Sequence, residues 1–106
     1  MELFHLDSET FDEVITAHEV PILVDFWATW CGPCQRQAPI LEDVATKLGE
    51  RAIIAKLNVD ESQETALKYG VASIPTMIIF KGGKEVDRMV GVTAADAIIE
   101  RIKAVE

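Results

Sequence analysis

The apolar run at residues 22–28, with the sequence ILVDFWA, places the strongest constraint on the fold of this chain. Asp25 is its only charged residue, and a nearly unbroken apolar run is typical of a parallel strand that is covered on both faces. A second run of this kind, AIIAKLNVD, occupies residues 52–60. The segment between the two runs has apolar residues at helical spacing, and Gly49 is expected to end the helix. Since parallel strands require a crossover connection, these segments predict a β-α-β unit.

Two short helices are expected before and after this unit. Thr10 and Glu13 have the T-x-x-E spacing of a capping box, which predicts a helix that begins after Thr10. Residues 64–69 have the pattern of a second short helix, and Gly70 is expected to end it.

The C-terminal part of the chain predicts a hairpin followed by a helix. The runs TMIIFK at 76–81 and KEVDRMV at 84–90 are separated by two glycines, a pattern typical of two antiparallel strands joined by a tight turn. Thr93 is the expected N-cap of the helix that follows. The elements together predict an α/β fold with a mixed sheet. The residues expected to face inward from the last helix are Ala97, Ile98, Ile102 and Val105.

Length, composition and charge narrow the class of protein. The chain has 106 residues, of which 49% are hydrophobic, so we expect one domain over residues 1–106 with a core that needs no structural disulfide. Its net charge of -8 repels phosphate backbones and anionic lipids, which argues against nucleic acid and membrane partners. The N-terminal residues lack the pattern of a secretory signal, and no apolar stretch approaches the roughly 20 residues of a membrane helix. We therefore expect a soluble, cytoplasmic monomer.

Cys31 and Cys34 are the only cysteines of the chain, and two residues separate them. A structural zinc site needs four Cys or His ligands, whereas the chain adds only His5 and His18 outside any second paired motif, so no metal is expected. A structural disulfide that closes so short a loop contributes only about 2 kcal/mol on the chain-entropy formula. Two buried, inert cysteines are a third interpretation. The pair, however, lies where a strand passes into a helix, and the free N–H groups and dipole of a helix N-terminus favour a reactive thiolate.

The positions of the two cysteines predict different roles. Cys31 lies at the start of the helix and nearest the loop surface, so its thiolate should be stabilised and it is the expected nucleophile. Cys34 follows one turn later, close enough to attack the Cys31 sulfur, which makes it the expected resolving thiol. Pro33 suits the first turn of a helix, and Gly32 allows another backbone to approach without a Cβ in the way.

The order of the motifs resembles that of the thioredoxin family. WCGPC is preceded by VDFWA and followed by AP, and AKLNVD, SIPT and VG come later in the same order, so the resemblance covers essentially the whole chain. It implies a mixed five-stranded sheet flanked by four helices. It also implies a protein-disulfide reductase without a bound cofactor, which reduces disulfide-containing client proteins and receives electrons from NADPH through a thioredoxin reductase.

The resemblance further implies roles for two charged residues. Asp25 corresponds to the buried base that takes the proton of Cys34, and Lys56 in the adjacent strand corresponds to its partner. Independently of the family, burial of an acid should raise its pKa into a range suited to proton transfer near neutrality. A purely structural pair of Asp25 and Lys56 is the alternative.

The substrate-binding residues are implied by the resemblance alone. Pro75 corresponds to a cis-proline that faces the disulfide, whereas without the resemblance it is an ordinary first residue of a strand. Backbone groups of Ile74 would pair with the bound substrate chain, Gly91 would leave room for it, and Trp30 would flank the groove. Trp27 is expected beneath the active site, although both tryptophans also suit a plain core.

Two other functions fit the same elements. A disulfide oxidase or isomerase typically carries His before the second cysteine, where it stabilises the reduced thiolate, and Pro33 cannot do this. A binding module would use the apolar groove around the motif without any redox exchange. Thr29, Gln35 and the Ala72-Ser73 pair differ from common bacterial residues around the docking surface, so the resemblance leaves the particular reductase and clients open.

Overall fold

The computed structural model describes residues 3–106, which form five strands and four helices. A 3₁₀ turn over Gly49–Arg51 follows the longest helix. None of the helices in residues 3–106 is both long enough and apolar enough to cross a membrane. The elements in chain order are β1 (Phe4–Leu6), α1 (Phe11–Ala17), β2 (Ile22–Trp27), α2 (Gly32–Leu48), β3 (Ile53–Asn58), α3 (Gln63–Lys68), β4 (Thr76–Lys81), β5 (Lys84–Val90) and α4 (Ala95–Ala104).

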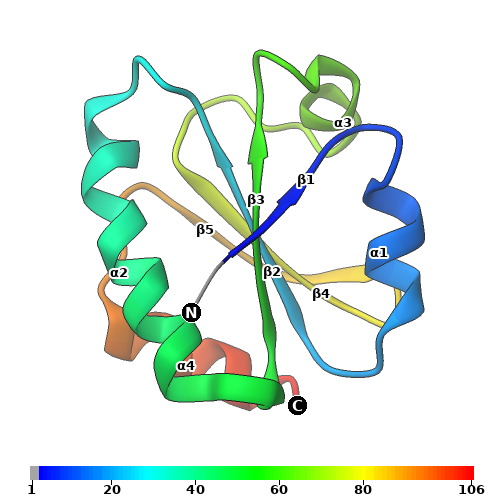
Figure 1. The fold of residues 1–106 in the computed structure, drawn as a ribbon, viewed down its shortest axis with the longest axis vertical. Coiled ribbons are helices and arrows are strands. Elements are labelled where there is room, and N and C mark those ends of the chain that lie inside the picture. The colour runs from blue at the N-terminus through cyan, green and yellow to red at the C-terminus, as the bar shows by residue number, and fades with distance from the viewer. Residues whose placement is uncertain (1–2) are drawn as a thin grey trace.

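The strands form one mixed sheet in the order β1-β3-β2-β4-β5 (Figure 1). β1, β3 and β2 are parallel to one another, whereas β4 and β5 are antiparallel to their neighbours. β2 therefore lies in the middle of the sheet, and α2 is the crossover between β2 and β3. In this register Asp25 lies opposite Lys56 on one side and Met77 on the other. The β-α-β unit, the hairpin and the mixed sheet predicted from the sequence are confirmed.

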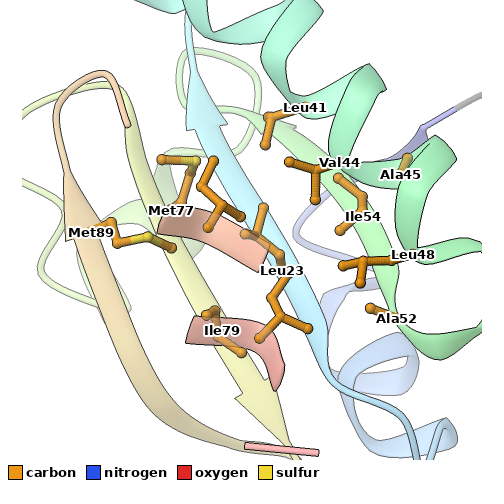
Figure 2. Close-up of a cluster of buried hydrophobic side chains, with 12 residues drawn as sticks. Leu23, Leu41, Val44, Ala45, Leu48, Ala52, Ile54, Met77, Ile79 and Met89 are labelled. Carbon is orange, nitrogen blue, oxygen red and sulfur yellow. The ribbon is translucent and has the colours of Figure 1, made fainter. Parts of the chain in front are cut away.

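Helices α2 and α4 cover one face of the sheet (Figure 1). Their apolar residues pack against every second side chain of the central strands, and Figure 2 shows the α2 residues beside Leu23 of β2 and Ile54 of β3. In β2 one such side chain is Leu23, and because side chains alternate along a strand, Asp25 points to the same face. The buried members of this core are Leu23, Leu41, Val44, Ala45, Leu48, Ala52, Ile54, Met77, Ile79, Met89, Ile98 and Ile102.

Helices α1 and α3 cover the opposite face, where aromatic rings form part of the core. The ring centroid of Phe11, the first residue of α1, lies 5.4 Å from that of Phe80 and 5.3 Å from that of Tyr69. Tyr69 and Phe80 meet edge to face, an arrangement that the ring quadrupoles favour. The sheet supplies most of the remaining buried residues of this core, namely Ile22, Val24, Phe26, Ala55, Leu57 and Ile78.

The capping box predicted for α1 is wrong. Thr10 precedes the helix but makes no side-chain capping bond to it. Instead, the carboxylate of Asp7 accepts hydrogen bonds from the backbone N–H groups of Glu9 and Thr10, each at 3.0 Å. The bonds from Thr10 hold the pKa of Asp7 below its usual value. Asp7 thus stabilises the turn before α1, and Glu13 has no reciprocal role there.

The N-cap predicted for the last helix is also wrong. α4 begins one residue later than expected, after Ala94, and Thr93 makes its hydrogen bonds elsewhere. Ile98 and Ile102 are fully buried, as predicted, and Val105 is partly buried. Ala97 is exposed because it lies outside the stripe of side chains that α4 turns towards the sheet.

Candidate active site

The CGPC motif begins just beyond the end of the central strand β2. Ala28 is fully buried, and its carbonyl accepts a hydrogen bond from the N–H of Cys31 at 3.3 Å, where the chain turns into α2. Cys31 is the N-cap of α2, Gly32 is its first residue, and Pro33 lies in the first turn, where its missing N–H is not needed. Cys31 and Cys34 form a disulfide across this turn. The predicted position of the motif at a strand-to-helix junction is confirmed.

The helix N-terminus makes the two sulfurs different. The backbone N–H of Cys34 donates a hydrogen bond to Cys31 Sγ at 3.1 Å. This donor and the positive end of the helix dipole stabilise negative charge on Cys31 more than on a sulfur one turn inside the helix. Exposure does not separate the two residues, since Cys31 is 4% and Cys34 is 3% exposed. The greater surface access expected for Cys31 is therefore not observed, and the asymmetry is electrostatic.

A loop before β4 faces the disulfide. The Ile74–Pro75 peptide bond in this loop is cis, as the family resemblance implies. The carbonyl oxygen of Ile74 lies 3.8 Å from Cys31 Sγ, so this backbone stands directly beside the sulfur. The Pro75 carbonyl accepts a hydrogen bond from the N–H of Gly91 at 2.8 Å. Gly91 has a φ of 89°, which favours glycine, and the space where a Cβ would point is open.

A surface groove lies next to this loop. Trp30 on its border is 69% exposed, and its indole N–H donates a hydrogen bond to Asp60 Oδ2 at 2.8 Å. An exposed indole held in this way presents a large apolar face at the surface. Asp60 was not predicted from the sequence, although Trp30 follows β2 and Asp60 follows β3, and the carboxyl ends of these parallel strands meet at one edge of the sheet. The groove has a volume of about 360 Å³ and is lined by Trp30, Val59, Val71, Ala72, Ser73 and Ile74.

Asp25 is fully buried on the face of the sheet that α2 covers. Neither of its carboxylate oxygens has a hydrogen-bond partner among the residues that the structure describes. Burial raises the pKa of Asp25 to about 7, and the positive charge of Lys56 opposes this shift without cancelling it. A carboxyl group with this pKa can take up and release a proton near neutrality.

Lys56 lies opposite Asp25 in the register, but within residues 3–106 no hydrogen bond joins its ammonium group to the carboxylate. Lys56 Nζ lies instead over the ring of Trp27, 4.2 Å from the ring centroid. Trp27 packs beneath the active site, as expected, in the cluster that contains Cys31 and Cys34. Lys56 therefore acts on the pKa of Asp25 through its charge and not through a hydrogen bond.

Gln37 is a buried polar residue that was not predicted from the sequence. It follows Cys34 by one turn of α2 and is fully buried. Its side-chain amide makes two hydrogen bonds to the backbone of Thr93, which lies between β5 and α4. A glutamine on the apolar face of a helix is the signal that could have revealed it, because a buried amide needs hydrogen-bond partners.

A sulfur pair at a helix N-terminus, next to a surface groove, is suited to the exchange of disulfides with other thiols. The fold and the site therefore define a thiol-disulfide oxidoreductase. Comparison with known families agrees with this class, since the family model described as Thioredoxin matches residues 2–104. The chain belongs to the thioredoxin family.

Relatives with this name match almost the whole chain. Thioredoxin from Chlorobaculum thiosulfatiphilum is 48% identical over 99 residues, which are 93% of this chain and 92% of the relative. Thioredoxin from Rhodospirillum rubrum is 43% identical over 95 residues, or 90% of this chain and 91% of the relative. The bifunctional thioredoxin reductase/thioredoxin of Mycobacterium leprae is 44% identical over 99 residues, which are 93% of this chain but 21% of that protein. The chain is thus a protein-disulfide reductase with a redox-active CXXC disulfide.

Proposed function

We propose that Cys31 is the nucleophile and Cys34 the resolving thiol of the reductase reaction. The Cys31 thiolate attacks one sulfur of a client disulfide, which forms a mixed disulfide and releases the other client sulfur as a thiolate. Cys34 then loses its proton and attacks Cys31 Sγ, so that the Cys31–Cys34 disulfide forms and the second client sulfur leaves. Over the cycle the client disulfide gains two electrons and two protons, and the dithiol of the reductase loses them.

The observation that carries this assignment is the hydrogen bond from the Cys34 N–H to Cys31 Sγ at 3.1 Å. A donor aimed at one sulfur stabilises the thiolate of that cysteine, which is the species that attacks. Gly32 and Pro33 form the exposed turn between the two sulfurs. We assign these two residues to redox tuning, because they set how the sulfurs approach each other and how a client reaches them.

Asp25 is the proposed proton acceptor for Cys34. Its carboxyl group is buried on the α2 side of the sheet, and its pKa of about 7 lets it take a proton under the conditions in which Cys34 must lose one. Lys56 is the proposed partner that keeps the pKa of Asp25 from rising further. Its charge therefore keeps a larger fraction of Asp25 in the form that accepts a proton.

Client proteins are proposed to bind in the groove beside the disulfide. The exposed indole of Trp30 supplies an apolar contact, and the backbone around Ile74 and Pro75 lies next to Cys31. Gly91, which donates a hydrogen bond to the Pro75 carbonyl, leaves open the space where a side chain would point. An extended client segment with a disulfide would lie along this backbone as a short added strand.

The oxidised form is proposed to be reduced by a thioredoxin reductase that takes electrons from NADPH, without a cofactor on this chain. The name of the relative from M. leprae, in which both activities occur together, supports a reductase as a partner. We further propose that residues 1–106 act as one domain and as a cytoplasmic monomer. Two cores that share a single sheet support the one domain, and a reducing compartment suits a dithiol that must stay available.

Reduction of insulin disulfides tests the proposal, first with dithiothreitol and then with a thioredoxin reductase and NADPH. The wild-type protein should accelerate both reactions. Cys31→Ser and the double variant Cys31→Ser, Cys34→Ser should accelerate neither. A double variant that keeps the full cellular activity of the protein would favour a binding module instead. A wild-type protein that works with dithiothreitol but not with the reductase would contradict the proposed electron donor alone.

A further inference from the structure

Gln37 makes polar contacts on a face of α2 that otherwise buries apolar side chains. It is fully buried, and Leu41 and Val44 further along α2 belong to the core. Gln37 Nε2 donates a hydrogen bond to the Thr93 carbonyl oxygen at 3.0 Å, and the Thr93 N–H donates one to Gln37 Oε1 at 2.8 Å. A buried amide is costly unless it is hydrogen-bonded, so this arrangement depends on both partners.

Thr93 belongs to the irregular segment that connects β5 to α4, and Figure 1 shows this segment in orange beside α2. The amide of Gln37 presents one donor and one acceptor to its backbone, as a neighbouring strand would. Thr93 Oγ1 donates a hydrogen bond to the Gly91 carbonyl at 3.1 Å, and the Gly91 N–H donates one to the Pro75 carbonyl at 2.8 Å. These bonds link α2 to the backbone that faces Cys31.

We infer that Gln37 is a positioning residue for client binding, which acts through Thr93 to hold the Gly91 backbone at the edge of the client site. The inference rests on the proposed function, because it takes Gly91 as part of the surface that a client covers. Cys31 and Cys34 lie on the same helix as Gln37. One rigid element therefore carries both the reactive sulfurs and the anchor of a segment beside them.

A purely structural role for Gln37 leads to a different expectation. Loss of two buried hydrogen bonds lowers stability in either case, but only a positioning role weakens the binding of a polypeptide without changing the chemistry at Cys31. A small aromatic disulfide can react at Cys31 without covering Gly91, whereas a polypeptide client covers both. The rate with a polypeptide disulfide relative to the rate with a small disulfide therefore distinguishes a positioning role of Gln37 from a purely structural one.

The test uses Gln37→Met, which keeps the length of the side chain and removes both hydrogen bonds. Single-turnover oxidation of the reduced protein is measured with insulin and with 5,5′-dithiobis(2-nitrobenzoate). We expect the half-saturating insulin concentration to rise about tenfold, while the limiting rate and the rate with the small disulfide stay within about twofold of wild type. Val44→Ala, a core change on the same helix, controls for lost stability and should leave both substrates unaffected.

Gln37→Glu keeps the inference testable if Gln37→Met folds poorly. A neutral carboxyl group can donate to the Thr93 carbonyl and accept from its N–H, whereas a carboxylate can only accept. Because burial can raise the pKa of a glutamate to about 8–9, this variant should bind insulin like wild type at about pH 7 and less well at about pH 9. Wild type measured at each pH corrects for the titration of the thiols.

Two results would overturn the inference. One is an unchanged half-saturating insulin concentration in both Gln37 variants at every pH. The other is an equal loss of rate with insulin and with the small disulfide, which would place the defect at the sulfurs. Failure of the wild-type protein itself to reduce insulin would instead overturn the proposed function, so the two failures are distinguishable.

Discussion

Asp25 and Lys56 face each other across β2 and β3 without an ion pair, because the Lys56 ammonium lies 4.2 Å from the centroid of the Trp27 ring. The Asp25 carboxyl group consequently has neither a salt bridge nor a hydrogen bond within the described part of the chain. An acid in this environment is more stable when it is protonated, so burial raises its pKa to about 7. The buried side of the active site thus contains an acid that is half protonated near neutral pH.

Asp25→Asn is expected to stabilise the protein above neutral pH. Asp25 has a pKa of about 7 in the folded state and about 3.9 in the unfolded state. Its favourable contribution to the free energy of unfolding is therefore complete below about pH 3.9 and is lost as the pH rises towards about 7. Above about pH 7 the buried carboxylate is a constant net cost to stability. The rise from about 3.9 to about 7 spans about three pKa units of about 1.4 kcal/mol each, and the neutral amide is buried without partners just as the neutral carboxyl group is, so we expect a gain of about 4 kcal/mol at about pH 8. Urea unfolding at pH values between about 4 and 9 measures this difference, which should vanish at the acidic end.

The same variant is expected to be a slower reductase, because an amide cannot accept the proton of Cys34. The rate at which Cys34 resolves the mixed disulfide should then no longer depend on pH around neutrality. Asp43→Asn, an exposed acid on α2, provides the control for loss of one negative charge. An Asp25→Asn protein that is less stable at every pH and turns over normally would contradict both the raised pKa and the proposed base.

Lys56→Met is expected to raise the pKa of Asp25 further. The charge of Lys56 is what opposes the effect of burial, and methionine removes that charge while it retains most of the apolar contact with Trp27. Titration of the Asp25 carboxyl carbon by NMR in both proteins measures the change directly. A pKa that stays the same or falls would show that Lys56 has no electrostatic effect on the acid.

Cys34→Ser is expected to trap client proteins on Cys31. The first exchange step needs only the nucleophile, whereas the second needs the sulfur that this variant lacks. Pull-downs from a lysate, eluted with dithiothreitol and compared with those of Cys31→Ser, should recover reducible adducts only with the Cys34 variant. If a reactive Cys31 formed no adducts, the two-step mechanism would have to be abandoned.

Cys31 is expected to react before Cys34 when the reduced protein meets an alkylating reagent. Both residues are almost equally buried in the disulfide form, so the preference should follow the N–H bond at Cys31 Sγ. Mass mapping after a short pulse of iodoacetamide at about pH 7 identifies the modified residue. First labelling at Cys34 would reverse the assignment of nucleophile and resolving thiol.

Gly83→Ala is expected to lower stability without affecting the reaction. A Cβ at this position would lie 2.9 Å from Thr16 Cγ2, and φ at Gly83 is 79°, which alanine adopts only with strain. We expect a loss of about 1–2 kcal/mol in denaturant unfolding. Gly82→Ala has the same kind of backbone strain, with a φ of 61° but open space around the new carbon, so the difference between the two variants isolates the Thr16 contact. Equal losses would show that the backbone alone is responsible.

The elements that define the fold could be predicted because their signals are local. β2 is buried on both faces and its sequence is a nearly unbroken apolar run, β3 is mostly apolar, and the CGPC motif marks the helix that joins them. The cap of α1 was not predictable from the spacing of Thr10 and Glu13, because Asp7 accepts the Thr10 N–H that Glu13 would bind in a capping box. A pattern over four residues cannot decide between two nearby acceptors.

The details of the active site depend on contacts between distant residues. The predicted strands place Lys56 next to Asp25, but a long side chain can reach several neighbours. Here the Lys56 ammonium group lies over the Trp27 ring. Gln37 and Thr93 are 56 residues apart, and no local pattern connects them. The hydrogen bonds between Gln37 and Thr93 can be identified only from the structure, in which α2 packs against the segment after β5.

β2 is flanked by β3 and β4 and covered by a core on each face, whereas β1 and β5 each have a neighbour on one side only. Local opening in a sheet begins at its edges, so fluctuations that release an outer strand leave the strand before Cys31 in place. The segments of the proposed client site follow the ends of β2, β3 and β5 or precede β4. Connecting segments of this kind generally tolerate changes in sequence better than the middle of a sheet does. Evolution can therefore give such a chain new clients by altering these segments, while the chemistry of the two sulfurs is inherited unchanged.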